Sequence, residues 1–130
     1  MRILSITAQK PHSTGSGVYL TETVRGFKEL GHTQAVIAGV TREDSVKLPE
    51  GVGFYPVYYN SPELPFPVCG MSDEMPYEST RYRYMKPDMV DKFEAAFGST
   101  VLRAVKEFRP DVVICHHLYL LAAIVREKLP

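Results

Sequence analysis

Apolar and polar residues alternate in blocks along this chain, and the blocks predict strands and helices in turn. Residues 2–8 form an apolar run rich in Ile and Leu, which suits a strand buried on both faces of a parallel sheet. Residues 9–17 are rich in Pro, Ser, Thr and Gly and predict a loop. Apolar positions near helical spacing over residues 18–30 predict a helix that ends at Gly31. Residues 33–40 predict a second strand and residues 52–60 a third, although Pro56 would remove one backbone donor from it.

Residues 61–87 interrupt this regular pattern. They contain five of the ten prolines of the chain, and none of these five stands where a helix could tolerate it. We expect an irregular, Pro-rich loop within the domain. A loop this long in a compact domain is more often functional than not.

Regular structure resumes at Asp88, which suits a helix N-cap. Apolar residues at helical spacing then predict a long helix to residue 108, residues 111–115 predict a fourth strand, and residues 118–129 begin a further helix. Strands that alternate with helices are typical of a parallel sheet joined by right-handed crossovers. We therefore expect one α/β domain over residues 1–130, a Rossmann-like parallel sheet with flanking helices.

Composition narrows the class of protein. The chain has 130 residues, enough for one domain, and its 15 basic residues balance 15 acidic ones, so no overall positive charge indicates nucleic-acid binding. Two cysteines, Cys69 and Cys115, argue against a disulfide framework and favour a reducing cytoplasm. Residues 10–12 interrupt the first apolar stretch before a signal peptide could form, and no window is long enough to span a membrane. We expect a cytoplasmic protein.

Two connections follow strands at the carboxyl ends, where such folds place their ligands. The first contains the sequence TGSGVYL (residues 14–20), whose glycines would let a phosphate approach the backbone amides and the positive end of a helix dipole. Leu20 stands where the dinucleotide fingerprint needs its third glycine, and residues 9–14 separate the glycines from the strand, so NAD and FAD are disfavoured. No P-loop is present. A simple turn remains the alternative for this segment.

The second connection begins with two adjacent histidines, His116 and His117, directly after the strand at residues 111–115. Neighbouring side chains on an extended chain point in opposite directions, so one histidine can face the cleft while the other packs against the sheet. The pair is poorly placed to hold one metal ion, even together with Cys115, and we expect no metal site. The alternative is that either histidine is purely structural.

The order and spacing of these motifs resemble the N-terminal domain of GT-B glycosyltransferases, in the retaining group called family 4. The resemblance rests on the first strand, the glycine loop, Gly31-His32 after the first helix, the second strand, and Pro110-Asp111 ahead of a hydrophobic strand and a histidine. It covers residues 1–40 and 109–121 and does not extend to the middle of the chain.

By this resemblance, the backbone of Gly15, Ser16 and Gly17 would bind the diphosphate of a nucleotide-sugar, a co-substrate, and no separate cofactor is implied. His116 would be the catalytic candidate near the transferring sugar and its acceptor, a small molecule or glycan; His117 would be a weaker, substrate-binding one. A complete enzyme of this kind has a second, nucleotide-binding domain. We therefore expect a truncated N-terminal domain with little transferase activity of its own, whose open sheet edge would favour a homodimer.

Arg81 and Arg83 stand among tyrosines within residues 61–87. Arginines fork onto phosphates or carboxylates and aromatic rings stack on sugars, which supports an acceptor-binding lid. The alternative is an irregular surface segment, or one that packs on a partner domain.

Two other functions compete with a transferase. One is a stand-alone, non-enzymatic Rossmann-like module that binds a small phosphorylated ligand or a protein. The other, a metal-dependent hydrolase built on His12, His116 and His117, would need a carboxylate cluster that the sequence lacks.

Overall fold

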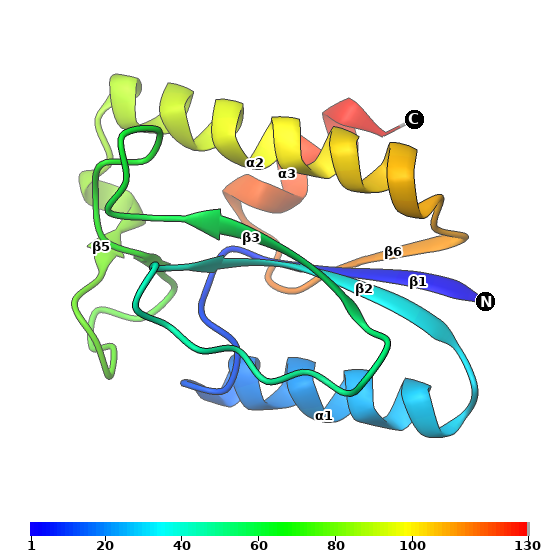
Figure 1. The fold of residues 1–130 in the computed structure, drawn as a ribbon. Helices are drawn as coiled ribbons and strands as arrows, with labels where there is room; N and C mark the ends of the chain where they lie inside the picture. Colours follow the sequence, from blue (N-terminus) through cyan, green and yellow to red (C-terminus); the bar gives the residue numbers. More distant parts are fainter. Residues whose placement is uncertain (130) are drawn as a thin grey trace.

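Four parallel strands make the central sheet of the computed structural model, which describes residues 1–129. The strands are β1 (Arg2–Thr7), β2 (Thr33–Val40), β3 (Gly53–Tyr58) and β6 (Val112–Cys115), in the order β3-β2-β1-β6. The helix α1 (Gly15–Glu29) covers one face, and α2 (Pro87–Phe108) and α3 (Leu120–Lys128) cover the other (Figure 1). The expected Rossmann-like α/β architecture is therefore confirmed.

The two central strands, β1 and β2, are buried on both faces, as their uninterrupted apolar sequences predicted. Along β2, Ala35 and Ile37 belong to the cluster under α2 and α3, whereas Val36 and Ala38 belong to the cluster under α1. This alternation follows from the two-residue period of a strand. Each central strand thus supplies side chains to two hydrophobic layers at once.

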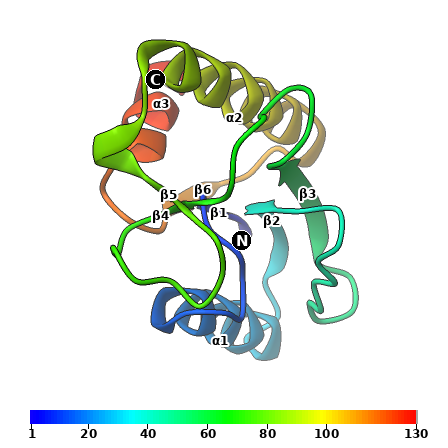
Figure 2. The ribbon, with the colours of Figure 1, turned by 90° about the vertical axis from the view of Figure 1, so that its left-hand side faces the viewer.

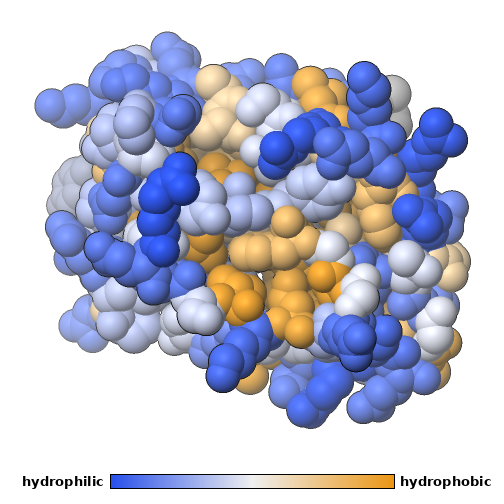
Figure 3. All heavy atoms as spheres, viewed as in Figure 1, coloured by the Kyte–Doolittle hydropathy of each residue, from blue (hydrophilic) through white to orange (hydrophobic). Residues whose placement is uncertain are grey.

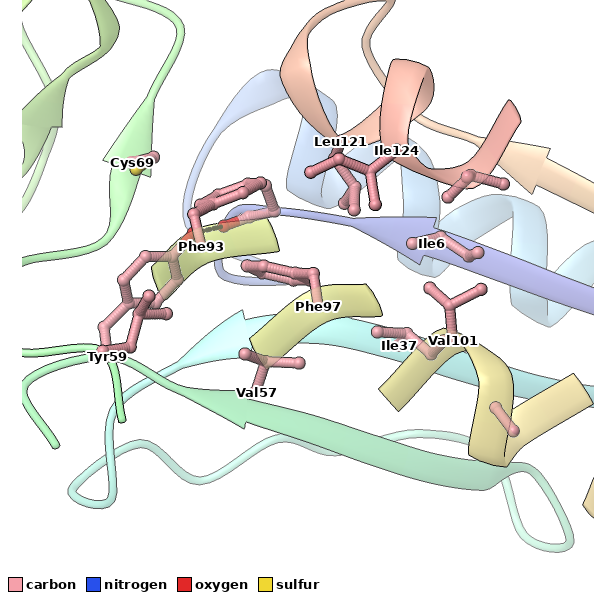
Figure 4. Close-up of a cluster of buried hydrophobic side chains, with 14 of the residues drawn as sticks. Ile6, Ile37, Val57, Tyr59, Cys69, Phe93, Phe97, Val101, Leu121 and Ile124 are labelled. Carbon is pink, nitrogen blue, oxygen red and sulfur yellow. Dashed lines mark hydrogen bonds between the residues drawn. The ribbon is translucent and has the colours of Figure 1, made fainter. Parts of the chain in front are cut away.

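The larger hydrophobic layer is organised by α2. Its side chains Phe93, Phe97 and Val101 follow one another at intervals of four residues, so they lie along one stripe of the helix, and all three are fully buried. They pack against the strands, and Leu121 and Ile124 of α3 lie beside them in the same layer (Figure 4).

The segment of residues 61–87 is more ordered than its prolines suggested. It contains two short paired strands, β4 (Cys69–Gly70) and β5 (Thr80–Arg81), and a 3-10 turn, η1 (Tyr82–Tyr84). Four of its apolar side chains are core residues: Leu64, Phe66, Val68 and Cys69. A proline-rich chain can join a core in this way because apolar burial does not require regular backbone structure.

Two helix starts differ from the expected positions. The helix α2 begins at Pro87 with Lys86 as its N-cap, so Asp88 is not the cap and Pro87 does not belong to the loop. Proline suits this position because the amide hydrogen that it lacks would have no partner in the first turn. The helix α1 begins at Gly15 with Thr14 as its N-cap, earlier than the apolar periodicity indicated, because the first turn is glycine and serine.

Asp111 lies just before β6 and fastens that strand to β1. Its carboxylate accepts a hydrogen bond from the Arg2 amide at 2.8 Å, and its own amide donates to the Arg2 carbonyl at the same distance. The Arg2 guanidinium donates in turn to the Phe108 carbonyl at the end of α2. The Pro-Asp pair of the sequence therefore has a structural role at the amino edge of the sheet.

The two edges of the sheet differ in character. On one edge, β3 carries Pro56, which is tolerated because an edge strand has one side without a ladder partner. On the other edge, β6 is less buried than the central strands although its sequence is wholly apolar, and Val112 is 38% exposed.

Figure 3 shows one face of the molecule, which is largely hydrophilic at its rim. The face is more hydrophobic towards its middle, where β3 and the connection before it lie in the same view of Figure 1. No helix within residues 1–129 is long and apolar enough to cross a membrane.

Gly39 offers a direct test of packing at the carboxyl edge. A Cβ atom there would lie 2.4 Å from both the Ala8 carbonyl oxygen and a ring carbon of Tyr59. We expect Gly39→Ala to lower the free energy of unfolding by about 2 kcal/mol or more, since neither neighbour can move freely. Urea unfolding measures this loss of stability. As a control, Gly26→Ala on α1 meets nothing within 4 Å and should raise stability by about 0.5–1 kcal/mol; equal effects of the two substitutions would contradict this packing.

Candidate functional site

The strand order places a topological switch point between β1 and β6. From β1 the chain moves outward to β2 and β3, and it then returns to the opposite side of β1 as β6. The connections that leave β1 and β6 therefore diverge from adjacent strand ends, and ligands of open α/β sheets bind in the crevice formed there. Figure 2 looks onto this carboxyl edge, with α1 below and the segment that carries β4 and β5 crossing it.

The first turn of α1 lies at this edge and presents free backbone amides. The Thr14 hydroxyl accepts a hydrogen bond from the Gly17 amide at 3.1 Å, which caps the helix. The first turn contains no acidic residue, so no carboxylate of the helix itself offsets the positive end of its dipole. A Cβ atom on Gly17 would lie 2.8 Å from the Lys10 carbonyl, whereas one on Gly15 would meet nothing within 4 Å. Gly17 thus allows the helix to approach the preceding loop, and Gly15 leaves space for a ligand.

A pocket of about 360 Å³ opens beside this turn. Its wall joins three connections: Gly15 and Ser16 from the start of α1, residues 71–72 and 74–76 after β4, and His117 after β6. The loop between β4 and β5 approaches the start of α1 from the sheet side (Figure 2). Residues far apart in the sequence therefore meet at the switch point, including three of the candidates that the sequence indicated.

Gln9 holds two walls of this pocket together, and the sequence analysis did not identify it as a site residue. Its side chain is 3% exposed, and its amide nitrogen donates to the Ser16 hydroxyl at 3.1 Å. Its amide oxygen accepts from the Met71 backbone amide at 3.0 Å. Both polar ends are thus satisfied, so Gln9 positions the walls and leaves their remaining groups to a ligand. The only sign of this role in the sequence is that Gln9, a polar residue, directly follows the apolar run of residues 2–8.

His116 lies against α1 and continues the ladder between β1 and β6. Its backbone amide donates to the Ile6 carbonyl at 2.9 Å, and its ring contacts Tyr19 edge-on at 6.1 Å between centroids. The ring nitrogen Nε2 is buried without a hydrogen-bond partner among residues 1–129. Burial, and secondarily the charge of His117, lower the pKa of His116, so the ring is neutral at pH 7.

His117 adopts a left-handed backbone conformation with φ of 75°. The assumption of an extended chain at the two histidines is therefore wrong, because the chain turns sharply at His117. Burial also lowers the pKa of His117. Of the two histidines, His117 lines the pocket with Gly15 and Ser16, whereas His116 packs beside Tyr19. The catalytic role of His116 stays a prediction.

Arg81 and Arg83 lie next to this pocket and outside its wall. Both approach Asp73, and together with Met71 and Tyr119 they line a second hollow of about 230 Å³. Nothing in the sequence singled out Asp73, because the pairing depends on how the loop between β4 and β5 folds back.

Lys10 fixes the far side of the same loop. Its ammonium group forms an ion pair with Asp44 at 2.9 Å and lies 4.6 Å from the ring centroid of Tyr77. Burial alone would raise the pKa of Asp44, but hydrogen bonds from Thr41 and Lys10 outweigh it and hold that pKa below its usual value. Lys10 therefore links its own loop to the loops that contain Asp44 and Tyr77.

The remaining reactive side chains do not form a second centre. Burial raises the pKa of Cys69 to about 12 and also raises that of Cys115, so neither thiol is ionised at neutral pH. No group of three or more His, Cys, Asp or Glu residues within residues 1–129 is arranged to hold a metal ion. His32 lies at the far end of α1, where its Nδ1 atom is 3.0 Å from the amino group of Met1.

We expect His116 and His117 to titrate below the ordinary imidazole value of 6.5, which NMR of the ring protons against pH will measure. His117→Asn should raise the pKa of His116, because it removes a neighbouring positive charge, and asparagine tolerates the left-handed backbone. A His116 that titrates at or above 6.5 in the unsubstituted protein would contradict its burial.

The same pKa shifts make stability depend on pH. Because the unfolded chain binds protons to these rings more readily, the free energy of unfolding should fall as the pH is lowered below about 6.5. Urea unfolding between pH 7.5 and 5 checks this against the double variant His116→Gln, His117→Asn, whose dependence should be shallower. Parallel curves would show that other groups control this range.

Comparison with known proteins yields no matching family model and no matching curated protein. The likeness to GT-B glycosyltransferases therefore remains an expectation from the sequence.

Proposed function

We propose that this chain is the acceptor-side, Rossmann-like domain of a glycosyltransferase that uses a nucleotide-sugar donor. One observation carries the proposal: the open N-terminal turn of α1 and the His117 side chain line a single pocket at the switch point of the sheet. A helix N-terminus suits a diphosphate, and an imidazole beside it suits a sugar or its phosphate.

The charges around the pocket support a sugar ligand better than an isolated phosphate. Its lining contains hydroxyl and amide groups, one carboxylate (Glu74) and no lysine or arginine. A carboxylate accepts hydrogen bonds from sugar hydroxyls but repels a phosphate, so a diphosphate would be confined to the amides of Gly15 and Ser16. In this proposal a second, nucleotide-binding domain supplies the remaining positive charge, whether in the same polypeptide or another.

The chemistry of transfer defines what each group would do. The bond between the sugar and the diphosphate breaks, negative charge grows on the leaving phosphate, and the sugar gains oxocarbenium character. The α1 amides would stabilise that negative charge. A neutral imidazole at His117 or His116 would hydrogen-bond a hydroxyl of the transferring sugar or of the acceptor, and Nε2 of His116 has no hydrogen-bond partner among residues 1–129.

A non-enzymatic module that binds a small phosphorylated ligand is the second candidate. It is supported by the pocket that the start of α1, the loop after β4 and His117 form together within residues 1–129. The two proposals differ in what they predict for residues 1–130 alone: the module binds its ligand tightly, whereas the transferase half binds a nucleotide-sugar weakly and transfers nothing.

Reading the coding frame beyond Pro130 separates these proposals first. A continuing frame that encodes a second series of strands and helices with a Glu-rich nucleotide motif supports the transferase. A stop codon directly after Pro130, with saturable nucleotide binding by the chain, supports the module and contradicts the transferase.

In the complete gene product, nucleotide-sugar turnover with a panel of UDP-, GDP- and ADP-sugars tests the histidines. We expect His116→Ala and His117→Ala each to lower kcat/KM by about 100-fold, the scale of a lost hydrogen bond to a reacting group. His32→Ala is the matched control, since His32 lies at the opposite end of α1 and should leave turnover unchanged. Full activity in both site variants would reject this site.

A further inference from the structure

Two arginines converge on one carboxylate beside the pocket at the switch point. The Arg83 guanidinium hydrogen-bonds Oδ2 of Asp73, and the Arg81 Nε atom lies 3.8 Å from Oδ1 of the same side chain. The Arg81 guanidinium also donates to the Asp73 backbone carbonyl at 3.2 Å. The two cations are thus held together around a single acidic group.

The arginine pair faces a hollow rather than a flat surface. The hollow measures about 230 Å³, and its wall includes the rings of Tyr82 and Tyr119, whose centroids are 4.5 Å apart. Met71 lines both this hollow and the pocket beside α1, so the two sites are neighbours. A ligand that extends from one site could reach the other.

The charges in this hollow do not balance. Asp73 supplies one negative charge against two permanent positive charges, and all three side chains are about half exposed, at 56%, 43% and 58% for Asp73, Arg81 and Arg83. The hydrogen bond from Arg83 holds the pKa of Asp73 below its usual value, so its carboxylate is ionised at neutral pH. One positive charge therefore remains for a ligand.

We propose that this hollow is a subsite for a phosphomonoester, in which the Asp73 carboxylate takes the place of the phosphate when no ligand is bound. A dianionic phosphate can neutralise both guanidinium groups and accept a fork of hydrogen bonds from each. A ligand monocarboxylate would bring only the charge that Asp73 already supplies at high local concentration, so it would compete poorly. The tyrosine pair adds ring surface for whatever carries the phosphate.

The assignment of this subsite to the acceptor rests on the proposed function, whereas the binding of phosphate does not. If both hold, the acceptor is phosphorylated, with its phosphate at Arg81 and Arg83 and its hydroxyl at the neighbouring pocket. Displacement of Asp73 would also free the loop between β4 and β5 from one of its anchors.

The test is a titration of the 130-residue chain with inorganic phosphate, followed by NMR of the arginine Nε–H and backbone amide signals. We expect Asp73→Asn to bind phosphate about fivefold more tightly than the unsubstituted chain, because the internal competitor is gone. Arg81→Gln and Arg83→Gln should each weaken binding, and the double variant should abolish it at this site.

Matched controls separate a built subsite from loose attraction to any exposed arginine. Arg25 is also exposed and pairs with a single carboxylate, Glu22, on α1. Glu22→Gln should therefore leave phosphate affinity unchanged, and acetate should bind the Asp73→Asn variant more weakly than phosphate does. Far-ultraviolet circular dichroism confirms that each variant is folded.

Three results would overturn the proposal. Unchanged or weaker phosphate binding by Asp73→Asn would show that Asp73 only anchors its loop. Phosphate-induced shifts confined to the amides of residues 15–17 would place the anion at α1, and equal binding of acetate would reject the phosphomonoester. Absence of nucleotide-sugar turnover by the complete, unsubstituted protein, with phosphate binding intact, would instead reject only the proposed function.

Discussion

The carboxyl edge of the sheet depends on the close packing of Tyr59 against Ala8 and Gly39. The Tyr59 side chain is fully buried, and its hydroxyl donates to the Ala8 carbonyl at 2.9 Å. Burial raises the pKa of Tyr59 well above its usual range, so the hydroxyl keeps the proton that it donates. Gly39 leaves room for this ring because a side chain there would collide with it. The ends of β1 and β2 and the start of the long segment before α2 are thereby held in one place.

The site at this edge combines few charges with well-fixed polar groups. The positive end of α1, the neutral His117 ring and the Gln9 amide line the first pocket, whereas the permanent cations Arg81 and Arg83 stand apart with Asp73. In the proposed function, such a separation would allow a ligand to place a hydroxyl-rich part in one site and a strongly anionic part in the other. Because Lys10 is committed to Asp44 and Tyr77, the loop between the two sites has a fixed far end.

Regular elements were predictable where one periodicity dominated the sequence. The apolar runs of β1 and β2 and the Phe93, Phe97, Val101 stripe of α2 each bury in the only way their spacing permits. The prolines of residues 61–87 indicated irregular backbone, but they concealed the core positions of Leu64, Phe66 and Val68, because burial there follows from non-local packing. The early start of α1 was missed for a similar reason: glycine and serine carry no helical periodicity, and the Thr14 cap decides the boundary.

By itself, the sequence determined the parallel α/β class, the glycines and histidines of the two connections that follow β1 and β6, and the arginines of residues 61–87. Only the tertiary structure decided which of these residues meet. The turn at His117 places its ring in the pocket, whereas His116 lies beside Tyr19. Because residues 71–76 fold back, Asp73 lies within reach of both Arg81 and Arg83. Periodicity acts between neighbours on one element, whereas a site at a sheet edge is assembled from connections whose direction is set by packing across the whole domain.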